Sequence, residues 1–452
     1  MRLACSIRPI LPSRRPSPRH ENIARAHERE GHPGAVTLVG MGSVGMDFLA
    51  SVASFPKPDD KMRTEELETQ GGGNCGNALT AAARLLSGLP EDVRTTVRVV
   101  SKIGNDGAGD AILKEFAADG VDTSNILVST KPGSKSPFTY IIVDRETSTR
   151  TCIHTPGDPY LEEEMTQERV DRILEGASAV YFDGRLAEPA LVLARAARAR
   201  GVKVLVEAER LRPGLDKLLQ EADFVVTSTG FPREWTGIEK VEDAMAAILG
   251  SLPHCAWIIT TLGKDGAVLL EIEGADMEGG KSADGTGIGA GTGADCGNRG
   301  DLAVGSIASG SAVSSAYEPS EGAFGPTDSA MMRKTRRDAA ERAALMNADE
   351  GKGGAYEQGA SSEDEGSRRA ISAYRLTSIE AANIDPAAVV DTTGAGDAFI
   401  GTMLFSVAIG LAPVKGARLG CVVAAAKCTK LGARPGLVRL GDIEGAAKFL
   451  DI

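Results

Sequence analysis

The chain has 452 residues, enough for one large α/β domain or two smaller ones. Hydrophobic residues make up 42% of it and charged residues 25%, which is ordinary for a soluble globular protein. The net charge of −12 argues against a nucleic-acid-binding protein, and any nucleotide site must be arranged locally because an acidic surface repels anions at long range. Seven scattered cysteines without a C-x-x-C pair favour reduced thiols in an intracellular compartment, with neither a disulfide framework nor a zinc site.

The first 20 residues contain five arginines and no acidic residue. This is the composition of an organellar transit peptide, which would direct the protein to a plastid or a mitochondrion. A disordered tail on a cytoplasmic protein explains the same composition equally well, so both interpretations stay open. In either case we expect residues 1–35 to form a tail, with one domain over residues 36–452.

A short apolar run from Val36 to Met41 predicts the first strand, and a glycine-rich turn follows it. Gly40 to Gly45 fits the G-x-G-x-x-G pattern of a dinucleotide-binding fold, and Asp59 lies at a distance that suits a ribose contact. Two prolines interrupt the chain beside Asp59, however, where such a fold has its second strand. A Rossmann-type oxidoreductase that binds NAD(P) is therefore one alternative interpretation.

A second glycine-rich stretch, QGGGNCGNAL, begins at Gln70 and opens an alanine-rich helix that is expected to end near Leu86. Glycines let the backbone approach a ligand closely, and Asn74 and Asn77 offer hydrogen-bond donors and acceptors from one turn. Further along, two β-rich runs at residues 138–143 and 149–154 flank a polar turn, which predicts a hairpin.

From Glu162 onward, short apolar strands alternate with helices. This pattern predicts a parallel sheet covered on both faces, with ligands bound at the carboxyl ends of its strands. Charged residues follow two of the predicted strands: Asp183 and Arg185 after the first, Glu207 and Glu209 after the second. Acids at a strand end either bind a substrate or are simply solvated, and the residues alone leave both interpretations open.

A loop between two later strands reads TTLGKDGA and contains Thr261, Gly263 and Gly266. Taken alone, it is an ordinary hairpin turn. Beyond it, residues 274–370 hold 19 glycines in 97 residues, against a usual share of about 7%. Such a segment buries too little apolar surface to order itself, so we expect a disordered, low-complexity insertion there.

The stretch from residue 389 to 411, VVDTTGAGDAFIGTMLFSVAIGL, predicts a strand at Val389 and Val390, a glycine turn and a buried helix. The turn points successive N–H groups at one spot, which makes an anion site that suits a phosphate. Asp397 would repel that anion unless it is a base for an attacking hydroxyl, or it merely caps the helix. The apolar run is slightly short for a membrane span, so we expect a core helix and no membrane association.

The string DTTGAGDAF, from Asp391 to Phe399, closely resembles the C-terminal signature of the ribokinase-like (PfkB) carbohydrate kinases. Four further motifs resemble that family in the same order along the chain: the glycine turn leading to Asp47, GGNxxN at 72–77, G-x-D-x-x-G at 104–109 and T-L-G-x-x-G at 261–266. GGNxxN and the strings around Arg185 and Glu207 are closest to ketohexokinase-type members. The resemblance implies a three-layer α/β/α sandwich with a mainly parallel central sheet and a small β lid.

The resemblance also implies an ATP-dependent kinase that transfers the γ-phosphate to a hydroxyl of a small sugar. A ketohexose such as fructose is favoured, while ribose and nucleosides stay open. Mg²⁺ would accompany ATP, K⁺ or another monovalent cation would bind nearby, and two copies would pair through the lid. The implied catalytic base is Asp397, and the implied anion hole is formed by Gly394, Ala395 and Gly396. The residues implied to bind the substrate are Asp47, Gly72, Gly73, Asn74, Asn77, Asp183 and Arg185, and those implied to bind the nucleotide are Thr261, Gly263, Gly266, Ser228 and Thr392. Asp391 and the backbone of Gly432 would hold the monovalent cation.

One departure from the family pattern bears on the metal. Many members carry N-x-x-E before a helix, which places an asparagine and a glutamate near the phosphates and Mg²⁺. Here Ser228 and Phe231 occupy those two places. Either the metal is positioned differently or activity is reduced, so a non-catalytic protein that binds sugar or nucleotide is a further alternative.

Overall fold

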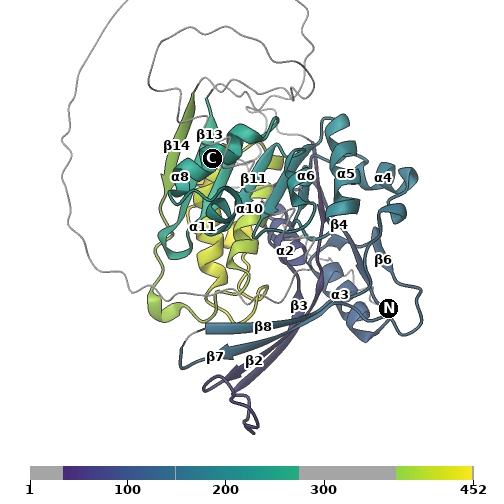
Figure 1. Cartoon of the computed structure of the whole chain (residues 1–452), viewed down its shortest axis with the longest axis vertical. Coiled ribbons are helices and arrows are strands. Elements are labelled where there is room, and N and C mark those ends of the chain that lie inside the picture. The colour runs from purple at the N-terminus through teal and green to yellow at the C-terminus, as the bar shows by residue number, and fades with distance from the viewer. Residues whose placement is uncertain (1–33, 148, 274–372, 450–452) are drawn as a thin grey trace, which may run out of the picture.

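Two sheets organise the described part of the chain, a large one of ten strands and a small one of four strands (Figure 1). The computed structural model describes residues 34–147, 149–273 and 373–449. The first strand begins at Ala35, one residue before its predicted start. The expectations for the N-terminal tail and for the insertion at residues 274–370 lie outside the described residues.

The large sheet is mainly parallel, as predicted. Its strands are β1 (Ala35–Met41), β4 (Arg94–Ile103), β5 (Val121–Asp122), β6 (Ile126–Val128), β9 (Ala179–Phe182), β10 (Lys203–Ala208), β11 (Phe224–Thr227), β12 (Trp257–Thr261), β13 (Ala267–Ile272) and β14 (Tyr374–Ile379). They follow the order β14-β13-β12-β11-β10-β9-β1-β4-β5, and β6 pairs with β4. In the order across the sheet, each neighbouring pair from β4 through β1, β9, β10 and β11 to β12 is parallel. The pairs β12–β13 and β13–β14 are antiparallel.

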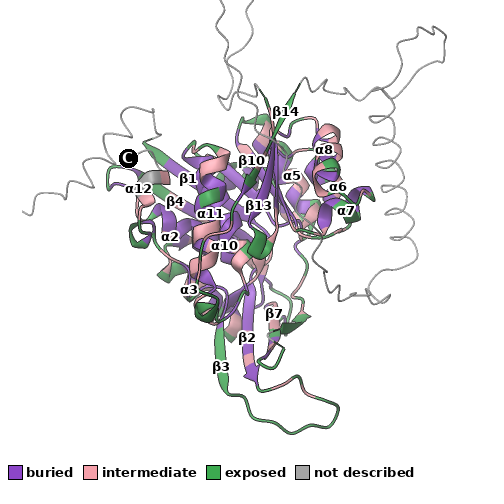
Figure 2. Ribbon diagram, turned by 90° about the vertical axis from the view of Figure 1, so that its left-hand side faces the viewer, coloured by how far each residue is buried: buried purple, intermediate pink, exposed green. Residues whose placement is uncertain are grey.

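Helices cover both faces of this sheet, and each layer of helices encloses its own apolar core (Figure 2). One core contains α2 (Asn74–Leu86), α3 (Gly107–Ala118), α10 (Ala395–Ala408) and α11 (Pro413–Lys427), with α12 (Ala446–Phe449) at its edge. The other contains α4 (Gln167–Leu174), α5 (Ala187–Ala199), α6 (Leu215–Leu219), α7 (Phe231–Thr236) and α8 (Val241–Ser251). Short 3-10 helices lie at Glu162–Glu164, Gly263–Asp265, Pro386–Ala388 and Leu440–Asp442. The three-layer α/β/α sandwich is confirmed.

Strand β1 explains why the central strands are continuous apolar runs in the sequence. Val36 and Leu38 pack into the first core, whereas Val39 and Met41 pack into the second. Side chains alternate between the two faces of a strand, so a strand covered on both faces needs apolar residues at almost every position.

The small sheet is the predicted lid. It consists of β2 (Gly45–Val52), β3 (Glu66–Gly72), β7 (Phe138–Asp144) and β8 (Thr149–Thr155), in the order β3-β2-β7-β8. The predicted hairpin is the antiparallel pair β7 and β8. The lid starts directly after β1, at the edge where the parallel strands end, and Figure 2 shows β2, β3 and β7 extending away from the body.

The glycine turn after β1 leads into a lid strand, β2, rather than into a helix. A dinucleotide-binding fold requires a helix at this point, because the helix N-terminus holds the pyrophosphate. The NAD(P) interpretation of Gly40 to Gly45 is therefore wrong. The strand and the turn fit both folds, and only the element that follows them distinguishes the two.

The strand predicted at Val389 and Val390 is also wrong. Both residues are exposed and belong to no strand. The N–H of Val390 donates to the carbonyl oxygen of Cys428, at the end of α11, at 2.8 Å. The β-branched residues favour an extended backbone here, but their hydrogen-bond partner is a helix end rather than a neighbouring strand.

Strands β13 and β14 form an antiparallel pair beyond β12, and residues 274–372 connect them. The N–H of Glu273 donates to the carbonyl oxygen of Ala373 at 3.0 Å, which holds the two ends of that connection together. Because β13 runs opposite to the parallel strands, this end of the pair lies at the edge of the sheet away from the lid.

Helix α10 is buried along nearly its whole length, from Ala398 to Ala408. It crosses α2 so closely that a β-carbon at Gly401 would lie 2.2 Å from the carbonyl oxygen of Ala78. Among the helices of the described residues, none is long and apolar enough to cross a membrane. The apolar C-terminal run is a core helix, as predicted.

Replacing Gly401 with alanine is expected to lower the free energy of unfolding by about 1–3 kcal/mol, because the added methyl group forces two helix backbones apart. Better helix propensity offsets at most about 1 kcal/mol of that clash. Urea denaturation measures this change in the free energy of unfolding. Gly107→Ala in α3 is the control, since a β-carbon there meets no atom within 4 Å. An unchanged midpoint for Gly401→Ala would contradict the close helix contact.

Candidate active site

The N-terminus of α10 presents unengaged N–H groups at one point. Gly394 precedes the helix with a φ of 76°, in the left-handed region that glycine adopts without strain. The N–H of Ala395 donates to the carbonyl oxygen of Thr392 at 3.2 Å, whereas those of Gly396 and Asp397 have no hydrogen-bond partner among the described residues. Such a pair of N–H groups at a helix N-terminus is an anion site that suits a phosphate.

Asp397 is the third residue of α10, and its carboxyl group lies beside this anion site. The Nδ2 group of Asn77, in α2, donates to its Oδ2 at 2.8 Å. Burial raises the pKa of Asp397 to about 6, while the hydrogen bond from Asn77 opposes that rise. A carboxylate with this pKa is ionised at neutral pH and basic enough to take a proton from a hydroxyl group.

Asn77 is oriented by a buried arginine that was not predicted from the sequence. The Nε of Arg434 donates to Oδ1 of Asn77 at 3.1 Å. Its Nη1 pairs with Glu115 at 3.2 Å, and its Nη2 donates to the carbonyl oxygen of Gly72 at 3.3 Å. Arg434 is 4% exposed, and its guanidinium lies 4.9 Å from the ring centre of Phe116. The available signal was a charged residue in the tight GARPG turn directly after two apolar helices.

Asp47 lies in the lid strand β2, and its carboxyl group lies against Gly72, whose carbonyl oxygen accepts the bond from Arg434. A β-carbon at Gly72 would lie 2.2 Å from the carboxyl carbon of Asp47, so only glycine leaves room for it. Burial raises the pKa of Asp47 to about 6, and the positive charge of Arg434 opposes the rise. Two predicted substrate residues thus lie near Arg434: Asn77 is bonded to it, and Asp47 lies against Gly72, whose carbonyl oxygen Arg434 also bonds.

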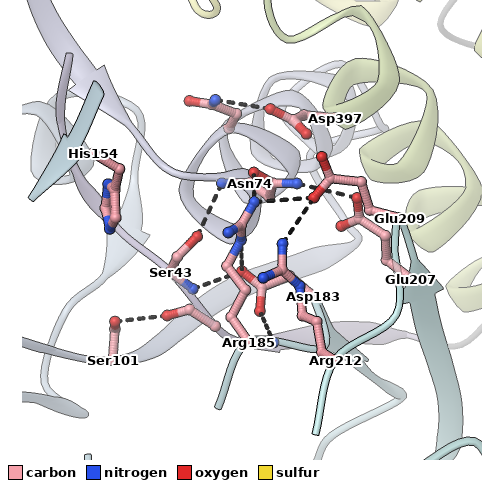
Figure 3. Close-up of polar contacts among 12 residues, drawn as sticks. Ser43, Asn74, Ser101, His154, Asp183, Arg185, Glu207, Glu209, Arg212 and Asp397 are labelled. Carbon is pink, nitrogen blue, oxygen red and sulfur yellow. Dashed lines mark hydrogen bonds and ion pairs between the residues drawn. The ribbon is translucent and has the colours of Figure 1, made fainter. Parts of the chain in front are cut away.

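Charged side chains also converge where β1, β9 and β10 end, as Figure 3 shows. Asp183 follows β9 and is buried. Its carboxylate accepts hydrogen bonds from the N–H of Ser43 at 2.6 Å and from the N–H of Arg185 at 3.0 Å. Because backbone groups engage both oxygens, Asp183 fixes the turn between the body and the lid.

Glu207, at the end of β10, is buried with two side-chain donors. The hydroxyl of Tyr181 donates to its Oε2 at 2.5 Å, and Nδ2 of Asn74 donates to its Oε1 at 3.1 Å. Burial and the negative charge of Asp397 raise the pKa of Glu207 to about 8, although the bond from Tyr181 favours the ionised form. A proton on Glu207 at neutral pH removes one negative charge from a site that must accept a phosphate.

Arg185 links the glycine-rich start of α2 to these strand ends (Figure 3). Its Nη2 donates to Oδ1 of Asn74 at 3.0 Å and to Glu209 at 3.1 Å. Arg212, which was not among the predicted site residues, also donates to Glu209 at 3.1 Å. Although burial pushes the pKa of Glu209 up, the surrounding arginines hold it below its ordinary value. The buried Nε of Arg185 makes no hydrogen bond within the described residues and lies 3.9 Å from Oδ2 of Asp183.

Four of the five predicted nucleotide residues lie at or just beyond the carboxyl ends of β11 and β12, next to the acidic cluster, whereas Thr392 lies in the loop before α10. Oγ of Ser228 donates to the carbonyl oxygen of Glu209 at 2.5 Å, and Oγ1 of Thr261 donates to a carbonyl oxygen of β11 at 3.2 Å. Gly263 and Gly266 have φ values of 60° and 87° in the turn that leads into β13. The hydroxyl groups of Ser228 and Thr261 therefore link the ends of neighbouring strands, and the two glycines allow the tight turn between β12 and β13.

The two places of the missing N-x-x-E motif offer no carboxylate. Phe231 is fully buried and packs against Trp235, with ring centres 5.4 Å apart. Across residues 34–147, 149–273 and 373–449, no three His, Cys, Asp or Glu side chains form a metal-binding group. Mg²⁺ needs only one or two protein carboxylates when phosphates and water supply its other ligands. The residues fit an Mg²⁺ ion that arrives with a nucleotide, with Glu209 as the neighbouring ionised carboxylate.

The lid reaches the anion site through its outer strand. Nη1 of Arg150, in β8, donates to Oγ1 of Thr392 at 3.0 Å. His154, on the same strand, lies at the margin of the charged cluster in Figure 3, and burial lowers its pKa. The lid therefore closes over the loop that precedes α10.

Asp391, predicted to hold a monovalent cation, has its oxygens engaged by the protein. Its carboxylate accepts from the N–H and the hydroxyl of Thr393 at 2.9 and 2.7 Å, and from the N–H of Gly432 at 2.7 Å. Its carbonyl oxygen accepts from Nζ of Lys427 at 2.6 Å. Gly432 turns its N–H toward Asp391, so these two residues do not fit a cation held between them.

Comparison with known proteins identifies the family to which the chain belongs. A sequence model described as pfkB family carbohydrate kinase matches residues 37–286 and 365–439, well over half of the chain. A ribokinase from Haemophilus influenzae is 25% identical over 233 residues, which cover 51% of this chain and 73% of that protein. A ribokinase from Staphylococcus aureus is 25% identical over 191 residues, which cover 42% of this chain and 59% of that protein.

Solved structures share the fold over almost the whole of their own chains. A putative ribokinase from Agrobacterium tumefaciens has a TM-score of 0.58 at 20% identity, covering 92% of this chain and 99% of its own. A ribokinase from Arabidopsis thaliana, complexed with ribose and ATP, has a TM-score of 0.57 at 16% identity over 92% and 99%. A putative ribokinase II from E. coli, in complex with ATP and Mg²⁺, has a TM-score of 0.56 at 15% identity over 91% and 99%.

Replacing Arg434 with methionine is expected to lower the free energy of unfolding by about 2–4 kcal/mol, because it leaves the carbonyl of Gly72 and the half-buried Glu115 without their partner. Chemical denaturation measures the loss. Arg418→Met, at an exposed position of α11, is the control and should change stability by no more than about 0.5 kcal/mol. Equal losses in the two variants would mean that the buried network around Arg434 adds nothing.

Proposed function

The chain belongs to the pfkB family of carbohydrate kinases, and on this premise we propose that Asp397 activates a hydroxyl group of a small sugar for transfer of the γ-phosphate of ATP. Family membership makes the protein an ATP-dependent carbohydrate kinase. The observation that supports the proposed site most is the first turn of α10. There a carboxylate with a pKa of about 6 lies beside two unengaged N–H groups.

In the proposed reaction, Asp397 accepts the proton of the acceptor hydroxyl as its oxygen forms a bond to the γ-phosphorus. The bond from that phosphorus to the bridging oxygen breaks, and ADP leaves. The N–H groups of Gly396 and Asp397 hold the negative charge that develops on the phosphoryl oxygens. Gly394 and Ala395 shape the turn that aims these N–H groups at the phosphate.

The sugar is expected to lie between the lid and the start of α2. Arg434 joins Asn77 to the carbonyl oxygen of Gly72, and Asp47 lies against Gly72. Gly72 and Gly73 allow a close approach to the backbone. Asn74 holds Arg185 and Glu207 at the far side of this space. Asp183 contributes by fixing the turn through which the lid is attached.

Ribose is the acceptor that we propose to test first, because the relatives reported above are named ribokinases. They give no support to the expected preference for a ketohexose. One observation keeps fructose as the second candidate. Asn74 belongs to the GGNxxN string that is closest to ketohexokinase-type members, and its side chain bonds to Arg185 at this side of the site.

ATP is proposed to lie against the loop between β12 and β13, near Thr261, Gly263 and Gly266, with its phosphates directed toward Ser228 and Thr392. Mg²⁺ would be held by the phosphates together with Glu209, and it would neutralise phosphate charge during transfer. Exclusion of water by the lid would favour transfer to sugar over hydrolysis of ATP.

Pairing of two copies through the lid is a further part of the proposal. Leu67, Tyr140 and Ile153 come from three lid strands, point to one face according to the strand register, and are exposed. An exposed apolar face of this kind is typical of an interaction surface.

We predict that the purified protein forms ADP with Mg²⁺-ATP and one member of a panel containing ribose, fructose, other small sugars and nucleosides. Asp397→Asn should reduce that turnover by roughly 10²–10⁴-fold, the usual loss when a general base is removed. Coupled detection of ADP and of the phosphorylated acceptor measures both.

The matched control is Asp243→Asn, an exposed acid at the third position of α8 as Asp397 is in α10. It should leave turnover unchanged. Near-normal turnover in Asp397→Asn would exclude it as the base. Binding of sugar or ATP without any turnover in the unmodified protein would favour the non-catalytic alternative.

Asn77→Ala is expected to move the acidic limb of the pH–rate profile to higher pH. The deprotonated form of Asp397 is the active base, so activity rises with pH through a pKa of about 6. Removing the Asn77 donor destabilises that form and raises the pKa, by roughly one unit for a charge-assisted hydrogen bond. The measurement is kcat/KM from pH 5 to 9.

Asn74→Ala is the comparison for this experiment, because Asn74 lies on the same helix but donates to Glu207. Its acidic limb should stay where it is in the unmodified protein even if its KM changes. A profile of Asn77→Ala that overlaps the unmodified one would show that Asn77 does not tune the base.

A further inference from the structure

Lys427 is a lysine without exposed surface. It is the last residue of α11, and its side chain is 0% exposed. Nζ donates to the carbonyl oxygen of Asp391 at 2.6 Å and lies 3.9 Å from Oδ2 of the same residue. A lysine is almost never fully buried unless it is paired, because removing its charge from water is costly.

The partners of Lys427 belong to the loop that builds the anion site. Asp391 opens the sequence DTTGAGD, and the N–H groups of Val390 and Asp391 both donate to the carbonyl oxygen of Cys428, at 2.8 and 3.1 Å. On the other side, the Asp391 carboxylate holds the N–H of Gly432. A β-carbon at Gly394 would lie 2.6 Å from that of Ala433, so the loop rests directly on the segment after α11.

Several negative partial charges meet at this point. The C-terminal end of α11 exposes carbonyl oxygens, and the Asp391 carboxylate adds a full negative charge beside them. A positive charge is needed here to hold the loop against the helix end. Burial lowers the pKa of Lys427, whereas the carboxylate of Asp391 opposes that change.

A bound K⁺ ion would have to use the same oxygens. The carbonyl oxygen of Asp391 already accepts from Nζ of Lys427, and its carboxylate oxygens accept from Thr393 and Gly432. An ion at this place would also meet the ammonium group at short range and be repelled by it.

We propose that the ammonium group of Lys427 takes the place of a monovalent cation beside the anion site, so that phosphoryl transfer by this protein does not depend on K⁺. Lys427 is then a positioning residue: it fixes the loop that aims the N–H groups of α10, and it does not contact the substrate. The activity arm of the test rests on the proposed kinase function, whereas the stability arm does not.

The unmodified protein supplies the first measurement. Turnover with Mg²⁺-ATP and the accepted sugar should differ by less than twofold between KCl and choline chloride at equal ionic strength. The melting temperature of the ligand-free protein should also be the same in both salts. Activation by K⁺ of tenfold or more, or a melting temperature that rises specifically with K⁺, would overturn the proposal.

Lys427→Ala supplies the second measurement. Turnover should fall roughly 10²-fold, the scale expected when catalytic groups are displaced by about 1 Å. Added KCl or NH₄Cl should restore part of it and raise the melting temperature of the variant. Choline chloride should do neither, because its cation is too large for the space left by an ammonium group.

Lys430→Ala is the matched control, an exposed lysine three residues further on, and it should respond to neither salt. Loss of activity in Lys427→Ala without cation-specific rescue would reduce Lys427 to a packing residue and overturn the proposal.

If Lys427→Ala does not fold, the comparison of KCl with choline chloride on the unmodified protein is the test of the proposal. If no sugar is phosphorylated, the kinase proposal fails, and the melting temperatures in the two salts still test Lys427.

Discussion

The backbone contact between α10 and α2 at Gly401 is the constraint on which the site depends. It brings together the helices that carry Asn77 and Asp397, whose side chains are 320 residues apart in sequence and 2.8 Å apart in space. Gly401 lies one turn beyond Asp397, and the atom that it approaches belongs to Ala78, next to Asn77. Any side chain at that position would separate the two helices and lengthen this hydrogen bond. The position of Asp397, the proposed base, is therefore set by helix packing and not by the glycine turn alone.

The charges around the anion site are arranged so that an incoming phosphate meets little uncompensated negative charge. Glu207 has a pKa of about 8 and is protonated at neutral pH, while Glu209 is paired with arginines. Asp391 is bonded by backbone N–H groups and by the ammonium of Lys427. Asp397 is held by a neutral amide, which leaves its negative charge available for the proton transfer proposed above.

Much of this arrangement could be predicted from the sequence because it resides in local patterns. Apolar runs in strands such as β1 indicated a sheet covered on both faces, and glycine turns indicated where a ligand approaches the backbone. The strand prediction failed at Val389 and Val390, where the residue type favours an extended chain but the hydrogen-bond partner is a helix end. The sequence pattern also did not distinguish a lid strand from a helix after the first glycine turn, because a strand forms there only by pairing with the later strands β3 and β7.

Arg434 and Lys427 could not be predicted for a different reason. Each is a charged residue within or after an apolar C-terminal helix, where the sequence pattern suggests exposure at a helix end. What buries them is a set of partners more than thirty residues away: Asp391 for Lys427, and Asn77 and Glu115 for Arg434. Long-range pairing of this kind leaves no periodic trace in the sequence.

The antiparallel pair of β13 and β14 has a consequence for how this chain can vary. The two described ends of the connection over residues 274–372 lie at adjacent backbone positions, with Glu273 bonded to Ala373 at the sheet edge opposite the lid. The entropy of closing such a connection grows only with the logarithm of its length, about 0.6 kcal/mol for each doubling. The hairpin therefore acts as an insertion point at which the chain can gain, lose or exchange a long segment. Such changes leave the distance between the phosphate site and the base unaltered.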